Sequence, residues 1–222
     1  FDTTFNNQGL VNIDAGTLQF NGGGTLAAAG ILAADAGTTV NFSNSYTIAD
    51  ASKLTGAGSY QISGGTVSLS GSVAASNLLI TGGITAGTHT FTAGATWNAG
   101  TMNSAGTTTN AAGSTFVIAT GADHDFNQRS IVNNGVVNWQ QGRLRSGTGV
   151  TVTNNNIWND TNSGTAALNN DYGGATLVFT NAAGGTYNKT GAGTTRFLVP
   201  LTNNGNFNLG AGTTQIHAGG TF

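Results

Sequence analysis

Residues 5–26, FNNQGLVNIDAGTLQFNGGGTL, contain the pattern that decides the fold of this chain. The stretch returns at the other end as residues 201–222, LTNNGNFNLGAGTTQIHAGGTF, and ten of the 22 aligned positions are identical. A weaker copy, IVNNGVVNWQQGRLRSGTGVT, occupies residues 131–151. Partial copies lie between them, which indicates that one small unit is used many times along the 222 residues.

The spacing of apolar residues inside this unit predicts β-strands. Val11 and Ile13 are two residues apart, and Leu18 and Phe20 repeat this spacing after a step of five. A spacing of two places side chains on one face of a strand. We interpret the step of five as a corner that keeps the apolar side inward. The equivalent inward positions in later copies are Val137, Trp139, Leu144, Phe207, Leu209 and Ile216.

The composition supports an ordered all-β domain that covers residues 1–222. Gly and Thr number 36 each, Ala 29 and Asn 27, and the chain contains no Glu. The hydrophobic fraction of 38% and its regular placement argue against disorder. No stretch sustains a period of 3.6, and the single proline excludes collagen. We therefore expect strands and turns throughout.

The repeat length predicts a single-stranded parallel β-helix, or β-solenoid. The better copies are offset from the first by 49, 84, 126 and 196 residues, all multiples of seven. This favours about ten coils of roughly 21–23 residues with three faces each, from residues 1–24 to residues 198–222. The known preference of β-strand crossovers favours a right-handed solenoid.

Asparagine recurs at two positions of the unit. If like positions stack on like, amide side chains form ladders along the rod. The expected ladders are Asn7 with Asn133 and Asn203, and Asn12 with Asn138 and Asn208.

The pattern NNxGxVNxxxGxL, found at residues 6–18 and in part at 133–144, resembles the repeats of large secreted bacterial β-solenoid proteins. These include haemagglutinin-like and autotransporter-passenger-like adhesins and surface fibre proteins. The resemblance covers nearly the whole chain. It implies an extracellular or cell-surface location and a role in adhesion, biofilm matrix or fibre formation. It implies no catalytic residue and no cofactor.

Charge and hydropathy limit the partners that we expect. The net charge of −2 and six scattered Lys and Arg residues give no nucleic-acid footprint. No apolar run reaches membrane-spanning length, and the absence of Cys excludes disulfides. Both terminal repeats are full-strength copies without a charged cap, and Phe1 begins in mid-pattern. We expect an excerpt of a longer chain that stacks on itself, head to tail, or on further repeats of the same polypeptide.

Residues 121–130, GADHDFNQRS, form the densest polar cluster. Asp123, His124, Asp125 and Arg129 could act on, or bind, an acidic polysaccharide, and the two carboxylates are weak candidates for a Ca²⁺ site. The simpler interpretation is a solvent-exposed turn rich in turn-forming residues. The sequence therefore predicts no metal site beyond these two candidates.

Arg143 and Arg145 alternate with an inward-facing Leu144, so both are expected to point outward. With His124, Arg129 and an exposed Trp158 they could contact a surface polysaccharide; the alternative is a solubilising outer face. The remaining aspartates are interpreted as corner residues: Asp14, Asp35, Asp50, Asp160 and Asp171.

Threonine alternates within residues 88–92, 107–109 and 151–153. A flat face of aligned Thr rows is how β-solenoid ice-binding proteins organise water, but the sequence suggests that these motifs do not share one register. The first hypothesis is therefore a non-enzymatic structural module of an extracellular fibre or adhesin. The alternatives are a carbohydrate-active or glycan-binding β-helix and an ice-binding solenoid.

Overall fold

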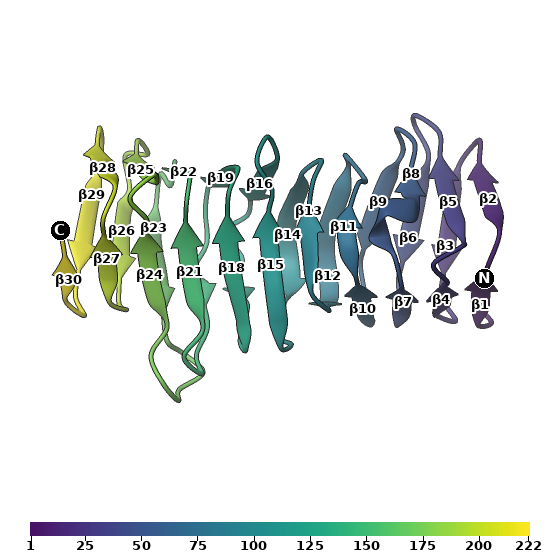
Figure 1. Cartoon of the computed structure of the whole chain (residues 1–222), viewed down its shortest axis with the longest axis horizontal. Coiled ribbons are helices and arrows are strands. Elements are labelled where there is room, and N and C mark those ends of the chain that lie inside the picture. Colours follow the sequence, from purple (N-terminus) through teal and green to yellow (C-terminus); the bar gives the residue numbers. More distant parts are fainter.

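The computed structural model, which describes all 222 residues, is a β-solenoid of about ten turns (Figure 1). The chain winds from one end of a rod to the other, so the two termini lie at opposite ends. Each turn contributes up to three short strands, and these build three faces. Every pair of neighbouring strands is parallel, as each strand lies beside its equivalent one turn later. The predicted all-β solenoid is therefore confirmed.

The three faces are defined by their strands. The first face holds β1 (Phe5–Asn7), β4 (Gly24–Leu26), β7 (Tyr46–Ile48), β10 (Thr66–Leu69), β17 (His124–Asp125), β20 (Leu144–Arg145), β23 (Thr165–Asn169), β26 (Thr194–Phe197) and β29 (Thr213–Ile216). The second holds β2 (Leu10–Ile13), β5 (Ile31–Ala34), β8 (Leu54–Thr55), β11 (Gly71–Val73), β13 (His89–Phe91), β15 (Gly106–Asn110), β18 (Arg129–Asn133), β21 (Thr151–Asn154), β24 (Val178–Asn181), β27 (Leu201–Asn203) and β30 (Gly220–Thr221). The third holds β3 (Thr17–Phe20), β6 (Thr39–Phe42), β9 (Ser59–Ile62), β16 (Thr115–Ile118), β19 (Val136–Trp139), β22 (Ile157–Asp160), β25 (Thr186–Lys189) and β28 (Asn206–Leu209).

Two long strands join the third face to the first. β12 (Leu78–Ala86) and β14 (Ala95–Thr101) continue around a corner, so these two faces form one 19-stranded sheet. Gly83 and Gly100 stack at this corner with φ of 63° and 78°. A Cβ on Gly100 would lie 2.8 Å from the carbonyl oxygen of Gly83, so the close backbone approach needs glycine.

The second face is divided into a three-stranded and an eight-stranded sheet. Between them lies η1 (Ala51–Lys53), a single 3-10 turn that Asp50 caps by accepting a hydrogen bond from the Ser52 N–H. This turn is the only helical element, and it is far too short to cross a bilayer. The predicted corner role of Asp50 is confirmed.

The interior is one continuous apolar column of 40 buried residues. Val137, Trp139 and Leu144 are buried, as the period-2 pattern predicts. Ile13 and Phe20 are buried at the other end of the rod, where Val11 and Leu18 are partly covered and pack against the column. Phe207, Leu209 and Ile216 also stack in register on inward residues of the previous turn. However, Leu209 and Ile216 lie on the uncovered end of the rod and are exposed.

The sequence repeat and the structural turn are not in phase. Residues 5–20 match residues 201–216, yet β1 lies on the first face and β27 on the second. An offset of 196 corresponds to nine turns of 21 residues and one additional face of seven. The repeated sequence therefore encodes a local strand–corner–strand shape, which recurs after a rotation by one face.

This phase shift corrects the predicted amide ladders. Asn133 and Asn203 do share a ladder, and Asn138 and Asn208 share another, but Asn7 and Asn12 belong to neither. Asn7 instead donates to the Ile31 carbonyl oxygen at 3.0 Å. The inner ladder runs through Asn110, Asn133, Asn154, Asn181 and Asn203, with Nδ2–Oδ1 distances of 2.7–2.8 Å. The outer ladder runs through Asn138, Asn159, Asn188 and Asn208, with distances of 2.9–3.0 Å.

Candidate functional site

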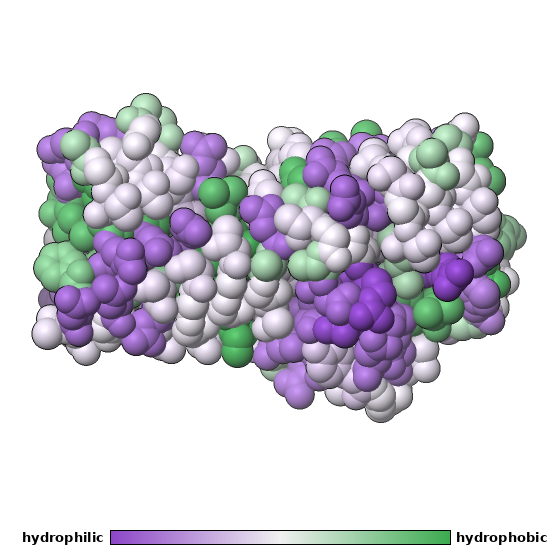
Figure 2. All heavy atoms as spheres, turned by 180° about the vertical axis from the view of Figure 1, so that it is seen from behind, coloured by the Kyte–Doolittle hydropathy of each residue, from purple (hydrophilic) through white to green (hydrophobic).

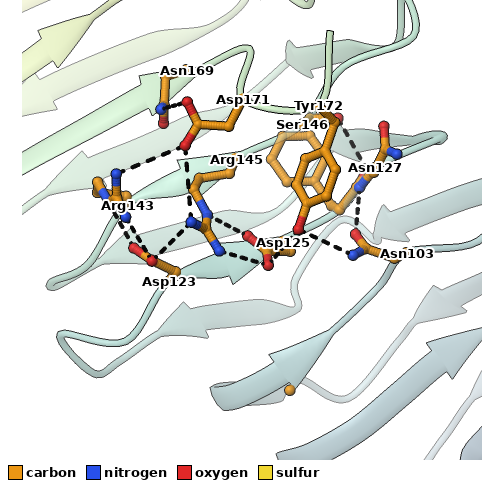
Figure 3. Close-up of polar contacts among 12 residues, drawn as sticks. Asn103, Asp123, Asp125, Asn127, Arg143, Arg145, Ser146, Asn169, Asp171 and Tyr172 are labelled. Atoms are coloured by element: carbon orange, nitrogen blue, oxygen red, sulfur yellow. Dashed lines mark hydrogen bonds and ion pairs between the residues drawn. The ribbon is translucent and has the colours of Figure 1, made fainter.

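The densest charged surface lies where β17 and β20 run side by side on the first face. Asp125 pairs with Arg145 in the strand register, and Asp123 lies opposite Arg143 at the preceding corner. Each arginine grips its aspartate with two parallel hydrogen bonds of 2.6–2.8 Å (Figure 3). Arg145 also lies 3.0 Å from Asp123. The prediction that these four side chains point outward is confirmed.

A loop from the following turn covers this charged surface. The loop joins β23 to β24, protrudes from the rod in Figure 1, and folds back over the preceding turns. Asp171 comes within 3.8 Å of Arg143 and 3.9 Å of Arg145. The Tyr172 hydroxyl donates to Asp125 at 2.7 Å and lies within 3.4 Å of Asn103 (Figure 3). The loop therefore connects turns that are distant in sequence.

The backbone of the loop is also held. The Thr148 N–H donates to the Gly173 carbonyl oxygen at 2.9 Å, and the Gly149 N–H donates to the Ala175 carbonyl oxygen at 2.6 Å. Tyr172 returns a bond from its own N–H to the Ser146 carbonyl oxygen at 3.1 Å. The sequence analysis placed Asp171 at a corner and missed this strap, which we define as residues 170–177.

The electrostatics of this cluster favour a fixed network. Hydrogen bonding to Arg143 lowers the pKa of the Asp123 carboxyl, and hydrogen bonding to Asp125 raises the pKa of Arg145. A glycoside hydrolase needs one carboxyl group with a raised pKa to act as an acid. Both guanidinium groups are already engaged by carboxylates, so neither is free to take up an anionic sugar. Figure 2 shows this surface from behind as the most hydrophilic area of that side.

Two of the predicted site residues point into the rod. His124 and Arg129 are fully buried, so the suggested glycan contact through them is wrong. His124 packs edge-on against Trp97 with ring centroids 4.8 Å apart, and burial lowers its pKa. Arg129 donates to the Met102 carbonyl oxygen, the Thr108 hydroxyl and the Ser104 hydroxyl. Strand alternation explains the result, because both residues occupy inward positions next to outward aspartates and serine.

Trp158 and Asp160 are further corrections. Trp158 was considered as an exposed sugar-binding ring, but it is fully buried and packs edge-on against Trp139. Asp160 was interpreted as a corner residue, yet its side chain is fully buried with that of Lys189. Lys189 was missed altogether. The signal that could have found the pair is the alternation of β22 and β25, in which the residues at both positions follow an inward aromatic by two.

A shallow polar depression lies beside the ion-pair network. It has a volume of about 360 Å³ and contains no hydrophobic side chain. Its lining residues are Gly121, Asp123, Gln141, Gly142, Arg143, Asn162, Ser163, Gly164 and Thr165. Sugar sites are usually built around an aromatic platform, and this depression has none. The structure contains no group of three or more His, Asp, Glu or Cys side chains that could hold a metal ion.

The threonine motifs come together on the second face, which corrects the sequence-based interpretation of their register. Thr90 pairs with Thr109, and Thr153 pairs with Thr180, which in turn pairs with Thr202. The eight-stranded sheet has twelve outward strand positions, and ten of them carry a hydroxyl group. These positions are Ser72, Thr90, Thr107, Thr109, Ser130, Val132, Thr151, Thr153, Val178, Thr180, Thr202 and Thr221. We call this surface the threonine face; it carries no charge.

Three comparisons with known proteins returned no match: a scan against family models, a search of curated proteins and a search of solved structures. The functional argument therefore depends on the geometry of the rod, its ends, its charged surface and its threonine face.

Proposed function

We propose that this chain is a structural, non-enzymatic rod segment of an extracellular bacterial fibre or adhesin. In this proposal its ends stack along the solenoid axis on further β-coils, either of its own polypeptide or of another copy. The observation that carries the proposal is the uncovered end of the apolar column. Leu209 and Ile216 continue the inward rows of Lys189 and Phe197, but they are 58% and 37% exposed.

The opposite end offers matching chemistry. Phe1 is 52% exposed and stacks on Phe5 with ring centroids 4.5 Å apart, while Phe5 packs against Phe20. The strand edges of β1, β2 and β3 face outward at this end, as those of β28, β29 and β30 do at the other. Apolar rows flanked by unpaired strand edges are a template for another parallel coil. A head-to-tail contact of this kind propagates as a filament.

The interior supports a load-bearing role. A single apolar column and the inner asparagine ladder run through successive turns, and most inter-turn connections are short. Each ladder amide bonds to the next turn, so neighbouring turns are coupled by side chains as well as by backbone. Such a rod resists bending because every turn contacts its neighbours over three faces.

The test is self-association of the 222-residue chain as a function of concentration, followed by sedimentation and electron microscopy. We expect rods that join end to end, with the coil spacing of about 4.8 Å repeated along the axis. Leu209→Lys or Ile216→Lys should prevent joining, because each places a charge on the end of the column. Leu198→Lys is the matched control, since Leu198 is 40% exposed on the side of the rod.

Two results would contradict the proposal. The first is a chain that stays monodisperse and monomeric at high concentration. The second is association that Leu198→Lys disrupts as strongly as Leu209→Lys, because that would indicate lateral rather than axial contacts.

The threonine face favours a second candidate function, binding to ice. Successive turns repeat its hydroxyl groups about every 4.8 Å along the rod, and alternate residues repeat them about every 6.6 Å across it. The strand pairing is in register from β11 to β30, so the rows stay aligned. A flat, uncharged array of hydroxyl and methyl groups at regular spacing can order water into a lattice. The absence of aromatic side chains on this face argues against a crystalline polysaccharide.

Ice binding is tested by watching ice crystals grow in the presence of the purified chain. We expect slowed growth and faceted crystals, and we expect Thr109→Lys or Thr153→Lys to abolish both effects. Thr47→Lys, on an exposed outward position of the first face, should leave them unchanged. Normal crystal growth with the wild-type chain would rule this function out.

A further inference from the structure

We propose that Lys189 and Asn162 are joined by an intramolecular isopeptide bond, which forms spontaneously in the folded rod with Asp160 as the proton carrier. Lys189 and Asp160 are fully buried, and Asn162 is 2% exposed. The inference concerns a covalent modification and does not depend on the function of the rod.

The three side chains are arranged around one carboxylate oxygen. Asp160 Oδ1 lies 3.6 Å from the Lys189 ammonium nitrogen and accepts a hydrogen bond from Asn162 Nδ2 at 2.9 Å. Lys189 Nζ also donates to the backbone carbonyl oxygen of Asn162 at 3.2 Å, so the amine and the carboxamide belong to one contact group. A nucleophile, an electrophile and a proton carrier within hydrogen-bond reach are the parts that such a reaction requires.

The surroundings hold this arrangement in place. The Tyr187 hydroxyl donates to Asp160 Oδ2 at 2.7 Å, and burial raises the pKa of Tyr187 well above its usual value, so it remains a phenol. Asn162 Nδ2 donates a second bond to the Trp139 carbonyl oxygen at 3.2 Å. Both lone-pair directions of the carboxylate and both amide hydrogens therefore have fixed partners, which limits unproductive rotation of the reacting groups.

The step balances without any co-reactant. Asp160 takes one proton from the Lys189 ammonium, and the free amine attacks Cγ of Asn162. Asp160 then passes its proton to the carboxamide nitrogen, the C–N bond to that nitrogen breaks, and ammonia leaves. The remaining proton on the attacking nitrogen passes through Asp160 to the ammonia, so the products are a secondary amide and an ammonium ion. Asp160 ends as the carboxylate with which it began.

Two features favour the product. A charged lysine inside a protein carries a large desolvation cost, and an amide at the same place is neutral. Asn162 also lines the polar depression beside the ion-pair network, which offers the departing ammonia a path to solvent. The bond would cross-link the turn ending in β22 to β25 across the longest inter-turn offset of the rod, the 29 residues that separate Asp160 from Lys189.

The decisive measurement is the intact mass of the purified wild-type chain. We expect it to be lower than the sequence mass by one molecule of ammonia. Trypsin should fail to cut after Lys189, and tandem mass spectrometry should find residues 146–196 as one peptide closed between Asn162 and Lys189. A wild-type mass equal to the sequence mass, or full cleavage after Lys189, would overturn the proposal.

Three variants and one control identify the atoms. Lys189→Met and Asp160→Asn should both restore the sequence mass, the first by removing the nucleophile and the second by removing the proton carrier. Asn162→Asp should lose one water molecule in place of ammonia. Lys53→Met removes the only other lysine, which lies on the 3-10 turn, and should leave the loss of ammonia unchanged.

The same variants exclude a different reaction. A cyclic imide formed by Asn162 alone would also lose ammonia, but it would persist in Lys189→Met and would leave Lys189 open to trypsin. That result would overturn the proposal. Circular dichroism of each variant establishes that it is folded, and the wild-type measurement decides the question even if a variant fails to fold.

Discussion

Asn133 on β18 donates from Nδ2 to Oδ1 of Asn154 on β21 at 2.7 Å, and both side chains are fully buried. Asn154 passes the same bond to Asn181 at 2.8 Å and donates to two backbone carbonyl oxygens, of Asn156 and Thr186. A buried polar group in an apolar column is tolerated because every amide hydrogen has a partner. The ladder therefore couples successive turns.

We predict that Asn154→Asp destabilises the rod by at least about 2 kcal/mol, because a carboxylate of the same shape cannot donate these bonds and brings a buried charge. The matched variant is Asn159→Asp in the partly exposed outer ladder, where the loss should stay below about 1 kcal/mol. Urea unfolding monitored by circular dichroism measures both. Equal losses at the two positions would show that the inner ladder has no special role.

The aromatic column predicts a large effect at Trp139. This ring packs edge-on against Trp158 at a centroid distance of 6.4 Å, and its Nε1–H donates to the Gly142 carbonyl oxygen at 3.1 Å. Trp139→Ala should lower the free energy of unfolding by about 3–5 kcal/mol through the cavity that it leaves. Asn138→Ala, one residue away on the outer surface, is the control. A loss below about 1 kcal/mol for Trp139→Ala would contradict the observed packing.

The charged surface predicts an asymmetry between its two arginines. The Arg145 side chain is 23% exposed and its partner Asp125 only 9%, whereas the Arg143 side chain is 45% exposed. Exposed ion pairs contribute little because water screens them, so Arg143→Met should cost less than about 1 kcal/mol. Arg145→Met should cost more, about 1–2 kcal/mol, and its loss should depend less on salt. Thermal unfolding at low and high salt compares the two variants.

The strap of residues 170–177 should loosen without unfolding the rod. Tyr172→Phe removes the hydrogen bond to Asp125 but keeps the ring. We expect faster hydrogen exchange at the amides of Thr148 and Gly149, which donate to the strap, and unchanged exchange in β19. Unchanged exchange at both amides would show that the backbone bonds alone hold the strap.

His89 predicts acid sensitivity. Burial, with a contribution from the nearby Arg129 charge, lowers the pKa of His89 from 6.5 to about 3. The unfolded chain therefore binds a proton that the folded chain refuses, and this contribution to stability is present above pH 6.5 and lost as the pH falls toward 3. The shift corresponds to a few kcal/mol, on the order of 3–5.

The measurement is the free energy of unfolding between pH 7 and pH 4 for the wild-type chain and for His89→Gln. The variant should be less stable at pH 7 and should lose less stability on acidification, because it carries no titrating group at that position. Parallel pH profiles for the two proteins would contradict the assignment. His217 is exposed, so His217→Gln is the control that should follow the wild-type curve.

Much of the fold follows from the sequence alone. Period-2 placement of apolar residues predicts which side chains enter the column, as at Val137, Trp139 and Leu144, because strand alternation is a local property. The outward direction of Arg143 and Arg145 follows from the same alternation. The repeat length predicts about ten turns, because each corner consumes a nearly constant number of residues.

Only the tertiary structure decided which residues stack on one another. Inter-turn offsets range from the 17 residues between Ile80 and Trp97 to the 29 residues between Asp160 and Lys189, and these differences accumulate along the rod. They rotate the first repeat by one face relative to the last, remove Asn7 from the inner ladder and align the threonine motifs. They also place Asp160 beside Lys189. Local patterning sets the direction of a side chain, but its neighbour one turn away depends on the length of every intervening corner.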